Sequence, residues 1–185
     1  MSLEQAKEQA NSRVSRTVVV LHWLLAASVF FLFVSSWWML GLPLPSDEFT
    51  YRVLPFQLHK NIGFSLFIVI VAMFAIRLFG RDKQELAARS QLQQLADIDH
   101  LIVYFLLALC CLSGYLSSSF SGWETTIWWV INLPAWTGED DALNILFSNI
   151  HMWSCWALLA VIAMHIAAAI YHGFGNDGMI DKMFR

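Results

Sequence analysis

The chain has 185 residues, of which 58% are hydrophobic and 14% are charged, and its formal net charge is -3. With a mean hydropathy of +0.56, this composition excludes an ordinary soluble domain and is typical of a protein that crosses a membrane several times. No basic patch indicates a nucleic-acid partner. Membrane lipid is therefore the first partner that the sequence predicts.

Four apolar segments account for most of the chain, and each is long enough to cross a hydrocarbon core about 30 Å thick. They are residues 18–40, 56–79, 101–120 and 147–171. The polar N-terminus shows no cleavage-site pattern, so we expect no signal peptide. The pattern predicts an all-α membrane protein, a four-transmembrane-helix bundle that forms one integral-membrane domain over residues 1–185.

The connections between these segments differ in composition. Turn formers around Pro43 and Pro45 separate the first two segments. The longest connection, residues 121–146, contains four tryptophans. Because such amphipathic rings concentrate at the membrane–water interface, we expect part of this connection to lie flat on the membrane.

The distribution of Lys and Arg predicts the orientation of the bundle. The N-terminus, the second connection and the C-terminus contain most of the basic residues, namely Lys7, Arg13, Arg16, Arg77, Arg81, Lys83, Arg89, Lys182 and Arg185. The first connection has only Arg52 and Lys60, and the third has none. The positive-inside rule therefore places both termini in the cytoplasm.

Two histidines interrupt the last apolar segment. His151 and His165 are 14 positions apart, which corresponds to about 21 Å along a helix axis. Fourteen steps of about 100° also bring them to nearly the same face. Ionisable side chains within a membrane are costly and usually functional, so this helix is predicted to present two ligands at two depths. The alternative is that each imidazole only hydrogen-bonds a neighbouring helix.

Depth groups the other histidines with these two. If the helices alternate in direction, His59 lies at the outer level with His151, and His22 lies at the inner level with His165. His100 and His172 are further inner candidates, and depth alone does not choose among them. The residues four positions after the four paired histidines are all small, which leaves room for a flat macrocycle. They are Ala26, Gly63, Cys155 and Ala169.

Imidazole binds several metals, but two separated pairs on facing helices favour haem iron with an imidazole on either side. The four apolar segments contain no carboxylate that would join the histidines in a di-iron site. Covalent haem attachment would need a Cys-x-x-Cys-His motif, which the chain lacks. We therefore expect non-covalent haem b. Because such iron has no free position, it should pass electrons rather than bind oxygen.

An ordered set of motifs resembles the bacterial cytochrome b561 family over nearly the whole chain. The motifs are Leu-His-Trp at 21–23, Leu-His-Lys-Asn-Ile-Gly at 58–63, His-Leu-Ile-Val-Tyr at 100–104, Leu-Ser-Gly-Tyr-Leu at 112–116, and His151 with thirteen residues before His165. The resemblance implies a multi-pass protein of the bacterial inner membrane with two haems b and a quinone as one redox partner, such as ubiquinone.

The resemblance also implies the haem ligands. It pairs His22 with His165 and His59 with His151, and it matches His100 to a family histidine that is not a ligand. His172, beside Tyr171, is either an interfacial histidine without a task or a group that exchanges protons with the quinone. Lys60 and Arg52 are either partners of the haem propionates or interfacial cations.

The source of electrons is open at this stage. One type in this family resembles a superoxide:ubiquinone oxidoreductase. A cationic outer surface would attract the superoxide anion, but the third connection here is acidic. Another type resembles the membrane cytochrome b subunit of a hydrogenase or dehydrogenase, which passes electrons for a periplasmic donor or another partner. A histidine-containing transporter, or an assembly factor without cofactor, is the alternative from a different class. The three cysteines lie at membrane depth, and we expect no disulfide.

Overall fold

The fold is described from a computed structural model, which places residues 3–43, 53–79, 91–122, 125–133 and 138–174, and the side chains of 16–43, 53–79, 94–122, 125–133 and 138–171 among them. The elements in chain order are α1 (Leu3–Leu40), α2 (Val53–Phe79), α4 (Gln91–Phe120), β1 (Thr125–Ile127), β2 (Ile131–Leu133) and α5 (Asp141–Phe174).

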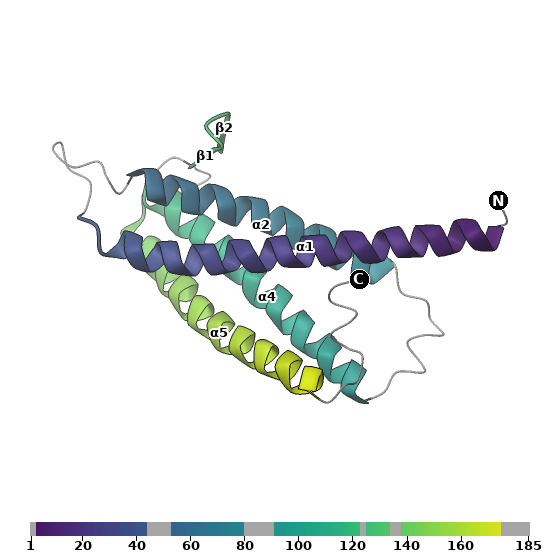
Figure 1. Cartoon of the computed structure of the whole chain (residues 1–185). Helices are drawn as coiled ribbons and strands as arrows, with labels where there is room; N and C mark the ends of the chain where they lie inside the picture. Colours follow the sequence, from purple (N-terminus) through teal and green to yellow (C-terminus); the bar gives the residue numbers. More distant parts are fainter. Residues whose placement is uncertain (1–2, 44–52, 80–90, 123–124, 134–137, 175–185) are drawn as a thin grey trace.

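Within the described residues, four helices are long and apolar enough to cross a membrane. They span Arg16–Leu40, Val53–Phe79, Gln94–Phe120 and Asp141–Tyr171. Successive helices run in opposite directions (Figure 1). The predicted all-α class and the four transmembrane segments are therefore confirmed, and the orientation of the termini across the membrane stays a prediction.

All four helices begin earlier than the apolar segments indicated, and α1 and α2 begin at Leu3 and Val53 rather than at residues 18 and 56. α4 begins at Gln91, ten residues before the predicted start, and α5 begins at Asp141, six residues before it. Asp140 caps α5, because its Oδ1 accepts the backbone N–H of Leu143 at 3.0 Å. At the other end of the first segment, α1 ends at Leu40 and the N–H of Gly41 bonds back to the carbonyl of Trp38. Polar residues thus continue the helices beyond the apolar runs.

A small apolar core lies where the four helices meet. Its buried members are Leu25, Val29, Leu66, Ile70, Met73, Leu107, Cys110 and Leu158. Many large apolar side chains point outward instead, and Phe30 and Phe79 are 71% and 88% exposed. Because water would make such a surface unfavourable, these side chains contact membrane lipid.

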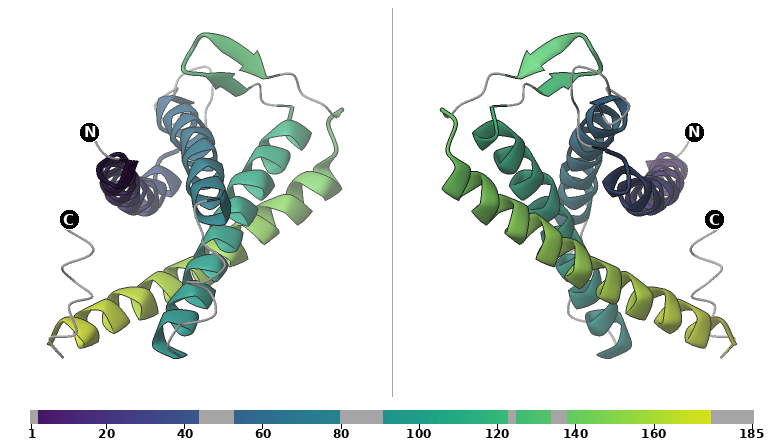
Figure 2. Two further views of the ribbon diagram at one scale, coloured as in Figure 1. Left: turned by 90° about the vertical axis from the view of Figure 1, so that its right-hand side faces the viewer. Right: turned by 90° about the vertical axis from the view of Figure 1, so that its left-hand side faces the viewer.

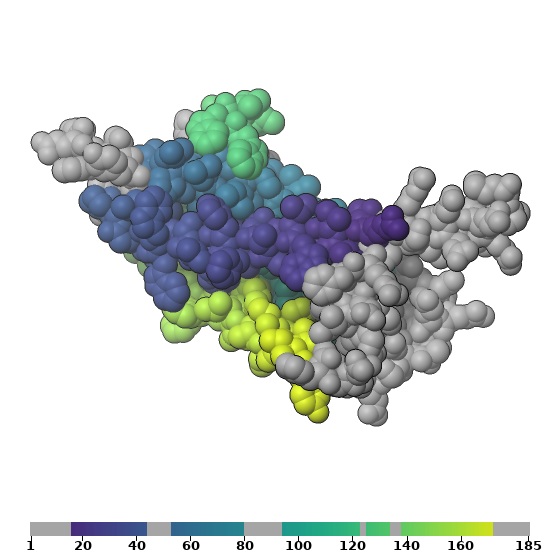
Figure 3. Space-filling view, in the orientation of Figure 1, coloured from purple at the N-terminus to yellow at the C-terminus, as the bar shows by residue number. Residues whose placement is uncertain are grey.

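The helices do not pack evenly. α4 and α5 cross each other, whereas α1 lies beside α2 (Figure 2). In the space-filling view α1 covers the face that is turned to the reader, with α5 below it and the hairpin above α2 (Figure 3). We call the end of the bundle near β1 and β2 the hairpin end, and the end where α2 stops and α4 starts the Asp99 end.

The hairpin was not predicted from the sequence. β1 and β2 pair antiparallel, with Thr125 opposite Leu133 and Ile127 opposite Ile131. The three-residue turn comprises residues 128–130, and two of them, Trp128 and Trp129, have φ angles of 46° and 59°. Turns of this kind prefer Asn and Gly, because bulky residues rarely adopt positive φ. The sequence therefore lacks the usual hairpin signal at this position.

A polar stripe on α2 holds the hairpin in place. Gln57, Asn61 and Ser65 are spaced four residues apart and therefore share one helix face. Gln57 Nε2 donates to the carbonyl of Thr126 at 2.8 Å, and Asn61 Oδ1 accepts the backbone N–H of Trp128 at 3.1 Å. The indole N–H of Trp128 donates to Ser65 Oγ at 3.1 Å. These bonds fix the hairpin over the start of α2; whether this connection lies flat on the membrane stays a prediction.

Candidate cofactor site

The structure brings two pairs of histidines together at the two levels that depth predicted. The ring centroids of His22 on α1 and His165 on α5 are 6.3 Å apart, and those of His59 on α2 and His151 on α5 are 6.2 Å apart. His151 and His165 are fourteen positions apart in one continuous helix, which places the two pairs about 21 Å apart along α5. One pair therefore lies toward each end of the bundle.

The spacing within each pair is that of two imidazoles on opposite sides of one metal atom. A metal–imidazole bond is about 2.0 Å long and the bound nitrogen lies about 1.2 Å from its ring centre, which places the two centroids about 6.4 Å apart. Both pairs match this spacing. His100 is also close to His165, but their centroids are only 5.3 Å apart. His22 therefore suits a shared metal with His165 better than His100 does.

A metal at either pair would need further ligands from a cofactor. Among the residues that the structure places, no group of three or more His, Cys, Asp or Glu side chains is arranged to hold a metal ion. A haem supplies four nitrogen ligands itself and leaves two axial positions for the protein. Pairs of imidazoles fit that requirement.

Hydrogen bonds orient three of the four imidazoles. Nδ1 of His151 donates to the backbone carbonyl of Cys110 at 2.8 Å. Nδ1 of His165 donates to Oδ2 of Asp99 at 2.5 Å, and Nδ1 of His59 lies 3.2 Å from Oγ of Ser36. An imidazole whose Nδ1 carries the proton has its Nε2 lone pair free for a metal. The Cys110 carbonyl and the Asp99 carboxylate accept, so the ring lone pair lies on Nε2 in His151 and His165.

Two glycines shape the space around the hairpin-end pair. A Cβ added at Gly63, one turn after His59, would meet nothing within 4 Å, so there is open space at this position. A Cβ added at Gly114 on α4 would lie 3.1 Å from both Cε1 and Nδ1 of His151. Gly114 thus allows the His151 ring to lie against α4. Gly63 follows His59 at the spacing that predicted a small residue, whereas Gly114 belongs to the motif at 112–116, which by itself does not indicate this contact.

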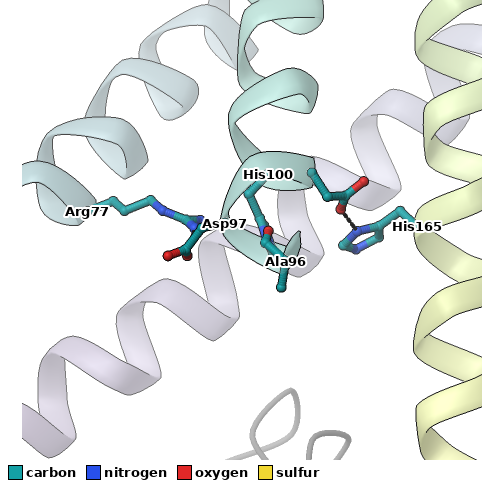
Figure 4. Close-up of polar contacts among 6 residues, drawn as sticks. Arg77, Ala96, Asp97, His100 and His165 are labelled. Atoms are coloured by element: carbon teal, nitrogen blue, oxygen red, sulfur yellow. Dashed lines mark hydrogen bonds and ion pairs between the residues drawn. The ribbon is translucent and has the colours of Figure 1, made fainter. Parts of the chain in front are cut away.

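The Asp99 end contains two carboxylates that lie within the third membrane-spanning helix but before its apolar segment. Asp97 pairs with Arg77 on α2, and Asp99 bonds to His165 (Figure 4). The expectation that no carboxylate joins the histidines was wrong, because α4 begins before the apolar run and its first turns face α2 and α5. His100 Nδ1 bonds to the carbonyl of Ala96 in its own helix at 2.5 Å.

The remaining predicted residues lie outside the pairs. Lys60 Nζ donates to Ser118 Oγ on α4 at 3.3 Å, at the hairpin end. Arg52 and the side chain of His172 lie outside the described residues. The three cysteines are free thiols; Cys155 Sγ lies 3.6 Å from Cys110 Sγ and 3.7 Å from Nε2 of His151.

Four membrane-spanning helices with paired imidazoles at two levels define a membrane cytochrome of the b type. Residues 13–185 match the model of the prokaryotic cytochrome b561 family, and the chain belongs to that family. It is also 29% identical over 164 residues to cytochrome b561 homolog 2 of Escherichia coli (strain K12), an alignment that covers 88% of this chain and 86% of that protein. The family binds haem b and transfers electrons in the bacterial inner membrane.

Proposed function

We propose that the chain is a dihaem cytochrome in which His22 and His165 hold one haem b and His59 and His151 hold the other. The observation that carries the proposal is the spacing of 6.3 and 6.2 Å within the two pairs. The bonds that Nδ1 of His151 and His165 donates support it, because they put the ring lone pair on Nε2.

The two levels of the pairs favour electron transfer through much of the membrane thickness. Haem b supplies a one-electron Fe(III)/Fe(II) couple, and iron with two imidazoles has no free position for oxygen. The distribution of Lys and Arg would place the Asp99 end in the cytoplasm. The hairpin end, with the His59–His151 pair, would then face the periplasm.

We propose a quinone as one redox partner. Reduction of a quinone to a quinol takes up two electrons and two protons, so a proton donor at the membrane surface is needed. His172 in the last turn of α5 is a candidate for this task. In a quinone-turnover assay on His172→Ala, an unchanged rate would exclude it.

A periplasmic electron donor suits the hairpin end better than superoxide does. Glu139, Asp140 and Asp141 are exposed there, before and at the start of α5, and their charge repels an anion. Superoxide is the second candidate, and Arg52 and Lys60 are the cations of the sequence that would favour it. Stopped-flow mixing of the oxidised protein with superoxide, with and without added salt, tests this candidate; haem reduction that slows as salt rises would support attraction by a cation.

The haem assignment is tested with a pyridine haemochrome assay and a reduced-minus-oxidised spectrum on the detergent-purified protein. We expect two haems b per chain, and fewer in each alanine variant of His22, His59, His151 and His165. His100→Ala is the matched control, because it removes a third imidazole from the same level as His22 and should keep both haems. A colourless, folded wild-type protein from haem-replete cells would refute the proposal and favour a transporter or an assembly factor.

The quinone assignment needs a separate measurement. Proteoliposomes with the oxidised protein are mixed with a short-chain ubiquinol, and haem reduction is followed at the α-band. Rapid reduction is expected, together with sensitivity to quinone analogues. Absence of haem reduction by ubiquinol and menaquinol, together with absence of haem reoxidation when the reduced protein is mixed with ubiquinone or menaquinone, would exclude a quinone partner and leave the dihaem assignment standing.

A further inference from the structure

The two histidine pairs differ in the charge of the groups that contact the Nδ1 atoms of their imidazoles. At the hairpin end, His151 bonds to a backbone carbonyl and His59 lies beside a serine hydroxyl, and both partners are neutral. At the Asp99 end, the partner of His165 is a carboxylate at 2.5 Å. Both side chains of this contact are largely covered, with 20% and 28% of their surface exposed.

The neighbouring charges leave this carboxylate directed at the histidine. Arg77 pairs with Asp97, the carboxylate two residues earlier in α4. His100, whose ring lies 5.3 Å from that of His165, bonds through Nδ1 to its own helix. Figure 4 shows Arg77 and His165 on opposite sides of this part of α4. Arg77 therefore pairs with Asp97, and Asp99 is left to accept the hydrogen bond from His165.

We propose that Asp99 is a positioning residue that fixes the tautomer of His165 and lowers the reduction potential of the haem at this end below that of the haem held by His59 and His151. The inference rests on the proposed dihaem function. Beyond that function, the inference states which haem has the lower reduction potential and which side chain lowers it.

The physical reason is the effect of the carboxylate on the ligand. A carboxylate that accepts the Nδ1 proton of an axial histidine makes Nε2 a stronger electron donor and so favours the oxidised iron. The negative charge itself also favours the state with the higher positive charge. A carbonyl or hydroxyl partner has a smaller effect, so the two haems should separate in potential.

The test is a spectroelectrochemical titration of the purified protein and of Asp99→Asn. Asn has the same shape and can still accept the Nδ1 proton, so haem content should stay at two. We expect two components in the wild type. In Asp99→Asn the lower component should rise by at least a tenfold change in the reduced-to-oxidised ratio, which is 59 mV for one electron, and the upper component should not move. The EPR signal of the low-potential ferric haem should shift with it.

Asp97→Asn is the matched control, because it removes the same charge two residues away without touching His165. It should leave the EPR signals of both haems unchanged and shift the lower component by less than Asp99→Asn does. Equal shifts in the two variants would show a general charge effect and overturn the inference.

Other outcomes separate the inference from the function on which it rests. Two haems in the wild type, with both potentials unchanged in Asp99→Asn, would overturn the role of Asp99 and leave the dihaem assignment intact. No haem in the folded wild type would overturn both. If Asp99→Asn loses one haem, Asp99→Glu decides the matter, because recovery of that haem supports a carboxylate that positions His165 and continued loss refutes it.

Discussion

Replacement of Gly114 by alanine should weaken haem binding at the hairpin-end pair. The added Cβ would lie 3.1 Å from Cε1 and Nδ1 of the His151 ring, closer than ordinary carbon contacts of about 3.5 Å. The His151 ring cannot simply turn away, because its Nδ1 bonds to the carbonyl of Cys110. Cys110 lies on α4, one turn before Gly114. Alanine therefore either pushes the ring from its position or breaks this bond.

The expected size follows from the cost of overpacking. Inserting a methyl group into a packed site costs about 1–3 kcal/mol. If this cost falls on the haem-bound geometry, haem affinity at His59 and His151 falls roughly 5- to 150-fold. The haem held by His22 and His165 should be unaffected, since that pair lies about 21 Å away along α5.

The assay is the haem-to-protein ratio after expression with limiting haem, combined with the transfer of haem to excess apomyoglobin. Gly114→Ala should approach one haem per chain and release one haem faster than the wild type. Gly138→Ala is the control, because a Cβ at that position meets nothing within 4 Å. Two haems with wild-type release rates in Gly114→Ala would refute the argument, and so would equal loss of both haems.

Three further substitutions test other parts of the structure. Gly63→Leu fills the open space after His59 and should displace the hairpin-end haem while leaving the apoprotein folded; retention of both haems would show that the cofactor does not use this space. Asn61→Ala removes the acceptor for the Trp128 N–H and should destabilise the protein by about 1–3 kcal/mol in detergent unfolding, with a smaller loss for Ser65→Ala. Asp140→Ala removes the cap of α5 and should cost about 1 kcal/mol; no change in the unfolding midpoint would count against the cap.

The sequence predicted best those features that depend only on distance along a helix. Long apolar runs predict membrane helices because the thickness of the bilayer sets their length, and all four runs form such helices in the structure. Alternating helix direction then assigns a depth to each histidine. That reasoning brought His22 to the level of His165 and His59 to that of His151, and the structure places these rings together.

The sequence failed where polar residues continue a helix or where contacts join distant segments. The apolar run predicts that the third helix starts at Leu101, which leaves Asp99 outside it, but α4 starts at Gln91 and brings that carboxylate to His165. Nothing in the local pattern around Trp128 and Trp129 indicates a hairpin. Its position depends on the polar stripe of α2, more than sixty residues earlier in the chain.

Composition, periodicity and the spacing of histidines thus determined the membrane class, the number of spans and the levels of the candidate ligands, because each depends only on distance along a helix or on the thickness of the bilayer. The crossing of α4 and α5 and the close approach of Gly114 to His151 depend on how side chains from separate helices fit together. Depth left both His22 and His100 as candidates beside His165, and the ring spacings of 6.3 and 5.3 Å favour the proposed pairing with His22. Such differences arise only from tertiary packing, since they are smaller than any distance that helix geometry alone can assign.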